Sequence, residues 1–291
     1  MVAEWSLDEG DEKIASKSEE RAKASVDVAT TSEAWNGAGN YAKYTQAWRY
    51  FNSVEDGSRV SKGWFKVVAA EMLNKGKYDD DEDAWYYADG SGKLYAGEFK
   101  TIKGKKYAFR NDGRMISGLK FIKVGNHDLV DVVADDDDNH SFEDEDAFLA
   151  EAYTYFEGNG YKCYYFGNGE DGAMRTGKTS LTFDGENTNF YFEKSGGKKG
   201  AGVTGEKDNK LYQSGMLLKA NSDDKYTVVD KETQTKAGGT KYVTYTKLDD
   251  AKAFIDSVKN HGGKVNDEVA GKEGSTKVTV GSNTTKKAED L

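Results

Sequence analysis

Short clusters of aromatic residues recur along the chain, and each is followed by a polar segment that carries glycine and one apolar residue. Segment 83–102 and the segment that starts at 103 align with an offset of 21 residues. The offset matches four pairs of residues: Tyr86 with Tyr107, Gly92 with Gly113, Leu94 with Met115, and Gly97 with Gly118. Four matches in one order indicate an internal repeat.

The same frame returns in other parts of the chain. The third copy places Phe166 in the aromatic role and has two residues inserted before its glycine, so that its apolar residue is Met174. A looser copy spans 189–202, an upstream copy spans 48–64, and the segments 208–220 and 224–239 are interpreted as eroded copies. The glycines and aromatic residues assigned to these copies are Gly172 and Gly177, then Phe192, Gly197 and Gly202, and upstream Phe51, Gly57, Gly63 and Trp64.

Apolar and polar residues alternate within each cluster, which predicts a short strand. The Asp-Gly or Gly-Gly pairs that follow favour a tight turn, because glycine adopts positive φ without strain. Each unit is therefore predicted to be a β-hairpin. A single hairpin is marginally stable in water, but stacked hairpins can share their rings. The predicted fold is mainly β: an elongated solenoid of stacked β-hairpin repeats with acidic insertions and a small C-terminal cap.

The pattern divides the chain into three parts. Residues 1–40 are acidic and partly helical or flexible, and residues 41–237 carry the repeats, with acidic insertions at 65–82 and 123–152. Residues 238–291 are predicted to form a strand-helix cap and a polar tail. The helix of this cap is predicted from apolar residues on one face: Leu248, Ala251, Ile255 and Val258.

Composition narrows the function classes. The 291 residues include 41 Lys plus Arg against 51 Asp plus Glu, a net charge of -10, with the basic residues scattered. We expect no nucleic-acid partner, because phosphate binding depends on a localised positive field. No apolar run reaches the roughly 20 residues of a membrane span, and the first ten residues have no signal-peptide pattern. Proline is absent, which excludes sorting motifs that require it.

The order of motifs resembles the cell wall-binding repeats of Gram-positive surface proteins, the choline-binding and glucan-binding repeats. The resemblance covers about 45–240 and is carried by Gly63-Trp64, Trp85-Tyr86-Tyr87, Asp112-Gly113, Met115 and Gly118. It implies a secreted, extracellular protein that is cell wall-associated without a covalent anchor, its signal peptide being absent from this sequence. The partners implied are a cell wall polymer or other glycan, or other surface proteins.

In choline-binding members, the resemblance implies an aromatic cage formed by the Trp after the first Gly and by rings of the following hairpins. Such faces attract a quaternary ammonium by cation-π interaction, and sugar C–H faces stack on the same rings. The one group that retains this pattern is a degenerate cage of Trp64, Trp85, Tyr87, Tyr107 and Met115. Elsewhere the Trp position is taken by Glu98, Leu119, Lys178 and Val203.

These residues also have a structural interpretation. Solenoid core is the favoured interpretation of the cage rings, and gap-filling core that of Met115 and Met174, with ligand contact as the alternative. Trp35 and Trp48 either cap the first hairpin or stack on glycan.

The acidic runs suggest a second chemistry. Asp135, Asp137, Asn139 and Asp146 have the alternate spacing of calcium ligands, but His140 stands where an EF-hand has glycine, and a final Glu is missing. A solvated loop is the alternative, and it also fits Asp79–Asp83. Cys163 is the single cysteine, and the three histidines, His127, His140 and His261, are far apart, so we expect no disulfide, zinc site or catalytic triad.

The sequence identifies no catalytic residue and no cofactor. No carboxylate pair lies in an apolar context that would raise one pKa for glycoside hydrolysis. The leading hypothesis is a non-catalytic surface protein that attaches to cell wall or glycan through its aromatic repeats. The alternative is a surface scaffold or protein-interaction module whose repeats have lost their cages. An enzyme would need a catalytic domain that is not found outside the repeats.

Overall fold

The computed structural model describes residues 49–50, 58–69, 74–125, 128–133, 142, 144–183, 185–220, 226–248, 251–260, 267–271, 278–280 and 283–285. The chain forms two compact units. The first contains Met1–Gly118, Ile122–Asn139 and Phe166–Met174, and the second contains Leu119–Phe121, His140–Tyr165 and Arg175–Leu291. The predicted N-terminal segment 1–40, Trp35 and Trp48 lie outside the described residues.

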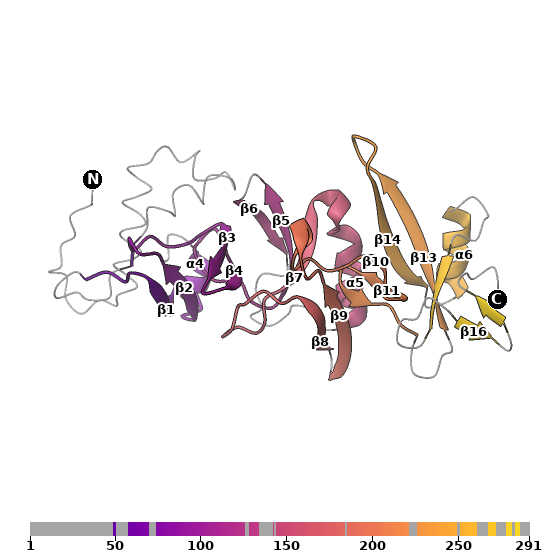
Figure 1. Cartoon of the computed structure of the whole chain (residues 1–291), viewed down its shortest axis with the longest axis horizontal. Helices are drawn as coiled ribbons and strands as arrows, with labels where there is room; N and C mark the ends of the chain where they lie inside the picture. Colours follow the sequence, from indigo (N-terminus) through magenta and orange to yellow (C-terminus); the bar gives the residue numbers. More distant parts are fainter. Residues whose placement is uncertain are drawn as a thin grey trace. The chain divides into compact units, whose positions relative to one another are not determined.

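The first unit is built from antiparallel hairpins (Figure 1). In it β1 pairs with β2, β3 pairs with β4, and α4 lies in the connection between β1 and β2. A three-stranded sheet has the order β6-β5-β7. The bounds are β1 Gly63–Val68, α4 Lys75–Asp79, β2 Asp83–Ala88, β3 Glu98–Ile102, β4 Lys105–Phe109, β5 Leu119–Gly125 and β6 Asp128–Val133.

The second unit combines further hairpins with helices. Strands β8 to β12 form one sheet in the order β10-β11-β12-β9-β8, and a second sheet has the order β14-β13-β15. The helices are α5 Glu145–Thr154, η1 Glu157–Asn159, η2 Gly196–Lys198 and α6 Ala251–Asn260. The strands are β7 Tyr161–Tyr165, β8 Gly177–Phe183, β9 Glu186–Phe192, β10 Gly205–Lys207, β11 Lys210–Gln213, β12 Met216–Leu217, β13 Tyr226–Thr235, β14 Lys241–Leu248, β15 Asp267–Gly271, β16 Val278–Val280 and β17 Asn283–Thr285.

The 21-residue offset is confirmed at the turns. Gly92 and Gly113 both have positive φ, 80° and 89°, and each donates its backbone N–H, over 2.9 Å, to the carbonyl of the residue three positions earlier. A single antiparallel bridge follows each turn, to Leu94 in one copy and to Met115 in the other. Matching positions of the two copies therefore occupy the same backbone environment.

One backbone hydrogen bond recurs in four copies and shows which residues are equivalent in them. Its donors are Tyr95, Ile116, Arg175 and Val203, and its acceptors are the carbonyls of Tyr87, Ala108, Tyr165 and Tyr191. Donor and acceptor are 8 residues apart in the first two copies, 10 in the third and 12 in the fourth. The turn between the strand and the bridge therefore lengthens along the chain, while the bond that closes it is retained.

A second bond joins each copy to the one before it. The N–H of Met115 donates to the Trp85 carbonyl over 2.7 Å, and that of Met174 donates to the Lys106 carbonyl over 2.8 Å. In the second unit, the equivalent bond runs over 2.8 Å from the N–H of Gly202 to the Cys163 carbonyl. Successive copies are thus connected through the same backbone positions, whatever side chain occupies them.

Two details of the predicted hairpin are wrong. The paired strands β3 and β4 are joined by Lys103-Gly104, both with positive φ, whereas the Asp112-Gly113 turn leads only to the single bridge. The fourth copy is also shifted by three residues. Its turn glycine is Gly200 and its second glycine is Gly205, because Gly202 takes the position of Met115.

The predicted insertions contribute structure. Residues 65–68 belong to β1, and segment 123–152 contains β6 and α5, whose Phe148, Leu149 and Ala152 are buried. These segments were assigned to insertions because their residues do not fit the repeat frame. These segments form regular structure because they pack against neighbouring elements, and a strand needs only a hydrogen-bonded partner and one covered face.

The C-terminal segment contains the strand β14 and the helix α6, while the eroded copy at 224–239 is mostly the long strand β13, which pairs with β14. The repeat Gln213 connects to this sheet, because its buried side chain accepts the Tyr245 N–H over 2.9 Å. The elongated solenoid stays a prediction.

The corrected register predicts that two nearby glycines differ in how much their substitution lowers the stability of the fold. A Cβ on Gly202 would overlap the Ser214 carbonyl, whereas a Cβ on Gly197 would meet no atom within 4 Å. Gly202→Ala should lower the free energy of unfolding by about 1–3 kcal/mol, because backbone must move, and Gly197→Ala should change it by less than about 0.5 kcal/mol. Urea unfolding followed by circular dichroism measures both. Equal effects would contradict the shifted register.

Candidate functional site

The β1–β2 hairpin has two different faces because residues alternate along each strand. Trp64 lies opposite Tyr87 and Lys66 opposite Trp85, while Phe65 lies opposite Tyr86. The Phe65 face forms core: the Phe65 ring stacks on Tyr50 at 4.7 Å and on Tyr86 at 5.6 Å between centroids. Covering this face leaves the opposite face, with Trp64 and Trp85, available to the following hairpin.

The opposite face carries a group of contacting rings that we call the Trp64 cluster. Trp64 contacts Tyr107 at 4.9 Å, Tyr87 at 5.0 Å and Phe109 at 5.8 Å between ring centroids. Its contact with Trp85, at 6.4 Å, is edge to face. The members of the cluster are Trp64, Trp85, Tyr87, Tyr95, Ile102, Tyr107, Phe109, Met115 and Ala173.

The structure therefore brings together all five residues of the predicted cage, but at different depths. Tyr107 and Met115 are buried, with 8% and 7% of their surface exposed, whereas Trp64, Trp85 and Tyr87 are only partly buried. Met115 also lies so close to Gly172 that a Cβ there would overlap its sulfur. Tyr107 and Met115 form the floor of the cluster, and the other three rings are the ones that reach its surface.

Sequence reasoning missed two rings and three charged residues of this surface. Tyr95 stacks on Tyr87 at 5.3 Å with an interplanar angle of 8°, and Phe109 is fully buried beneath Trp64. The charged residues are Lys66, Lys100 and Glu170. The alternation along β1 could have identified Lys66, two residues after Trp64, but nothing local indicates Glu170.

A carboxylate fixes the orientation of Trp85. The indole Nε1 of Trp85 donates to Glu170 Oε2 over 3.0 Å, and Lys66 Nζ donates to Glu170 Oε1 over 2.8 Å. The hydrogen bonds from Lys66 and from Trp85 hold the pKa of the Glu170 carboxyl below its usual value. At neutral pH the ionised carboxylate thus connects the ring to the lysine that faces it across the hairpin.

The turn next to the cluster contains a buried ion pair. Arg114 Nε donates to Asp112 Oδ2 over 2.8 Å, and both side chains are 9% exposed. Asn74, which caps α4 by accepting the Lys77 N–H, also donates its side-chain amide to Asp112. Burial by itself would raise the pKa of Asp112, but Arg114 and Arg110 outweigh it and lower that pKa.

The remaining Trp positions of the repeats do not form comparable clusters. Leu119 is fully buried, Lys178 is exposed, and Glu98 forms an ion pair with Lys100. In the fourth copy the shifted register puts Glu206 at this position, so the assignment of Val203 is wrong. Val203 instead belongs to a buried group with Tyr191, Tyr212 and Leu217.

The calcium hypothesis stays a prediction. Asp146 lies in the first turn of α5, and Asp135, Asp137 and Asn139 lie outside the described residues. Within the described ranges, no group of three His, Cys, Asp or Glu side chains could hold a metal ion. In the same part of the chain, no helix is long and apolar enough to cross a membrane.

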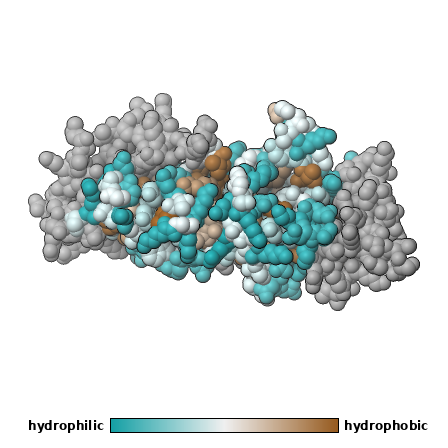
Figure 2. Space-filling model, viewed as in Figure 1, coloured by the Kyte–Doolittle hydropathy of each residue, from teal (hydrophilic) through white to brown (hydrophobic). Residues whose placement is uncertain are grey.

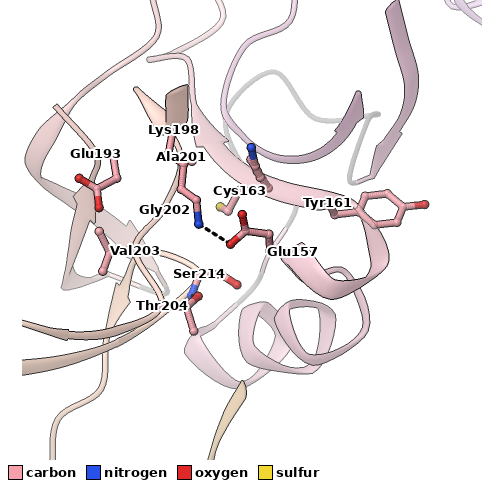
Figure 3. Close-up of a pocket in the computed structure, with 11 residues that line it drawn as sticks. Glu157, Tyr161, Cys163, Glu193, Lys198, Ala201, Gly202, Val203, Thr204 and Ser214 are labelled. Carbon is pink, nitrogen blue, oxygen red and sulfur yellow. Dashed lines mark hydrogen bonds and ion pairs between the residues drawn. The ribbon is translucent and has the colours of Figure 1, made fainter. Parts of the chain in front are cut away.

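A pocket of about 100 Å³ in the second unit has mixed polar and apolar walls (Figure 3). At its edge the Lys198 ammonium meets the Glu157 carboxylate at 2.7 Å, and the Tyr161 ring points away from it. The Cys163 thiol also lines the pocket, but burial raises its pKa well above the usual value, so it is not a thiolate nucleophile. The pocket offers no ring for stacking.

The fold and the site define a β-hairpin repeat protein that carries a half-buried aromatic cluster built from two hairpins and the segments beside them. The viewed surface of its described residues is mainly hydrophilic, with small hydrophobic patches (Figure 2). No family model and no curated protein matches the sequence.

Solved structures of repeat proteins do match. Choline-binding protein F from Streptococcus pneumoniae is 18% identical, over 59% of this chain and 54% of that chain, with a TM-score of 0.18. The autolysin LytC from the same organism is 16% identical, over 69% and 37%, with a TM-score of 0.21. The cell wall endolysin of phage Cp-1 is 17% identical, over 60% and 35%, with a TM-score of 0.23.

The chain spans about half the length of choline-binding protein F and about a third of the length of the endolysin. TM-scores near 0.2 carry no weight for the site, which is defined by the ring contacts and hydrogen bonds given above.

Burial of Tyr107 predicts a large loss of stability on truncation. Tyr107→Ala should lower the free energy of unfolding by about 3–5 kcal/mol, because it leaves a cavity beneath Trp64. Tyr78→Ala, which removes a tyrosine 36% exposed, is the control and should cost less than about 1 kcal/mol. Urea unfolding monitored by tryptophan fluorescence distinguishes them. A Tyr107→Ala effect as small as that of the control would show that this ring is not core.

The buried ion pair predicts a pH dependence. The pKa of Asp112 is lower in the folded protein than in the unfolded chain, where it is about 3.9. Its stabilising contribution is therefore complete above that value and is lost as pH falls through the folded pKa. Asp112→Asn should lower stability at pH 7 by about 3–5 kcal/mol, because Arg114 stays buried without its partner.

Denaturant unfolding from pH 2 to pH 7 tests this expectation. Below about pH 4 the free energy of unfolding should fall less in the Asp112→Asn variant than in the wild type, because the variant has no carboxylate at this position to protonate. Asp79→Asn removes an exposed carboxylate and should retain the wild-type profile. An unchanged acid profile in Asp112→Asn would contradict the assignment.

Proposed function

We propose that this chain is a non-catalytic, secreted surface protein that attaches to cell wall polymer or another glycan by stacking on the Trp64 cluster. The observation that carries the proposal is the gathering of Trp64, Trp85, Tyr87 and Tyr95 at one hairpin face, each ring only partly buried. Aromatic rings of this kind present an apolar face to sugar C–H groups and a polar edge to hydroxyls. The partly exposed rings therefore offer stacking faces to a sugar.

The ring geometry favours a sugar over a cation held between rings. A cage places an ammonium within about 6 Å of several ring centroids, which requires space between the rings. The rings around Trp64 instead touch each other, with centroids 4.9–6.4 Å apart. A sugar needs only one accessible face, so these contacts do not prevent it from binding. The Cp-1 endolysin named above was solved with choline, but its likeness to this chain is too weak to transfer that ligand.

A scaffold is the second candidate. The mutual contacts of the Trp64 cluster and the full burial of Phe109 are also what hairpins need for stacking alone. On this account the repeats provide shape, and other surface proteins are the partners. The two candidates differ in whether the partly exposed rings bind anything.

Retention on purified Gram-positive cell walls and on insoluble glucan distinguishes the candidates. We expect the wild type to sediment with at least one of these polymers. Trp85→Leu removes a ring but keeps apolar contact, and it should weaken retention about fivefold, since ring stacking contributes about 1 kcal/mol. Trp64→Leu should act in the same direction. Tyr78→Ala is the matched control, because Tyr78 lies on α4 and not in the cluster.

Circular dichroism of each variant first establishes that it is folded. Failure of the wild type to bind either polymer would favour the scaffold. Binding that is unchanged in folded Trp64→Leu and Trp85→Leu would place the glycan site elsewhere on the chain.

A further inference from the structure

Two lysines of the first unit lie over rings of the Trp64 cluster. Lys66 Nζ is 5.8 Å from the centroid of the Trp85 ring, and Lys100 Nζ is 4.9 Å from that of the Tyr95 ring. Both distances lie within the range of about 6 Å in which an ammonium is attracted by an aromatic face. Two of the four partly exposed rings, Trp85 and Tyr95, therefore already have a cation beside them.

Each of these lysines is held in place by a carboxylate. Lys66 Nζ lies 2.8 Å from Glu170, and Lys100 Nζ lies 2.8 Å from Glu98. Glu170 also accepts the hydrogen bond from Trp85, so one carboxylate fixes the ring and the cation together. The side chain of Glu98 is only 19% exposed, which limits the positions that Lys100 can adopt.

Glu98 and Lys100 occupy the same positions in their repeat as Trp64 and Lys66 do in theirs. Glu98 follows Gly97 as Trp64 follows Gly63, and Lys100 and Lys66 each stand two residues further along their strands. Alternation therefore puts each lysine on the same strand face as the residue after glycine. Where the resemblance expects a second Trp wall, the chain has a carboxylate that binds a lysine.

We propose that Lys66 and Lys100 are built-in cations that lie against one face of the Trp85 and Tyr95 rings and disfavour the binding of quaternary ammonium ligands there. They are specificity-determining residues, which restrict the surface to uncharged glycan; in this respect the inference rests on the proposed function. A free cation must displace a tethered ammonium and also approach a second positive charge. An attached group competes as if present at high local concentration, whereas a free ligand loses translational freedom on binding.

The second unit contains a related contact between a lysine, a carboxylate and a ring. Lys207 Nζ lies 5.2 Å from the centroid of the Tyr191 ring and 3.8 Å from Glu193. Lys207 directly follows Glu206, so it lies on the opposite face of its strand from the Trp position, and Tyr191 is buried. The contact shows that a lysine paired with a carboxylate can lie over a ring in this fold, but it does not repeat the register of Lys66 and Lys100.

Removing the lysines should create a cation site. Lys66→Met and Lys100→Met keep an apolar stem over the ring and remove the charge, while Glu170 and Glu98 stay behind. We expect choline chloride to change tryptophan fluorescence little in the wild type. The double variant should bind choline with an apparent Kd at least about fivefold lower. Sodium chloride at equal ionic strength controls for screening, and Lys75→Met, whose lysine pairs with Asp79 on α4, should resemble the wild type.

A second measurement uses the unaltered binding surface. In protein labelled with ¹³C at the lysine ε-carbon, ring currents should shift the Lys66 and Lys100 methylene protons upfield, and the single variants assign these signals. Unshifted signals for both lysines would overturn the inference, as would choline binding in the wild type as tight as in the double variant. Wall retention is tested separately with Trp85→Leu. A gain of choline binding without wall retention would therefore reject the glycan function alone, and retention without any gain would reject the role of the lysines alone.

Discussion

The bond from one backbone N–H to the preceding repeat is the interaction on which the rest of this structure depends. Met115 to Trp85, Met174 to Lys106 and Gly202 to Cys163 are the three examples, and the donor is methionine in two of them but glycine in the third. Because the bond uses backbone atoms, the side chains of a repeat can differ while the repeat still bonds to the preceding one at the same backbone position. Burying these groups without partners would cost about 1–3 kcal/mol each, which keeps the spacing fixed.

Positive-φ turns make that bond possible. In each copy the segment after the strand turns back beside that strand. The positive-φ glycine of this turn lets the N–H two residues further on point at a carbonyl of the preceding repeat. Gly113 shows the constraint most directly, since its φ is 89° and a Cβ would lie 3.3 Å from the Tyr86 ring. The loop between strand and bridge can lengthen, as it does in the third and fourth copies, provided that the turn ends in the same way.

Fixed spacing between hairpins also explains the Trp64 cluster. It sets Trp64 against rings from the next hairpin at contact distance, so Tyr107 and Phe109 become core and the rings nearer the edge stay partly exposed. Charged side chains then surround these edges, and the polar partners of Trp85 come from residues far away in sequence, such as Glu170. The same packing that stabilises the repeats therefore positions the surface that we propose binds glycan.

The sequence by itself determined the repeat, the equivalence of Gly92 and Gly113, the mainly β class and the group of Trp64, Trp85, Tyr87, Tyr107 and Met115. These features follow from local rules, because glycine turns and alternating rings are read within a few residues. It misplaced the fourth copy, since several glycines there fit the pattern equally well and only the hydrogen bond of Gly202 selects one register. Tertiary structure alone decided how deeply each ring is buried, which strands the expected insertions supply, and which ammonium and carboxylate stand beside Trp85 and Tyr95. Those properties depend on contacts between residues distant in the chain, and a local pattern carries no information about such contacts.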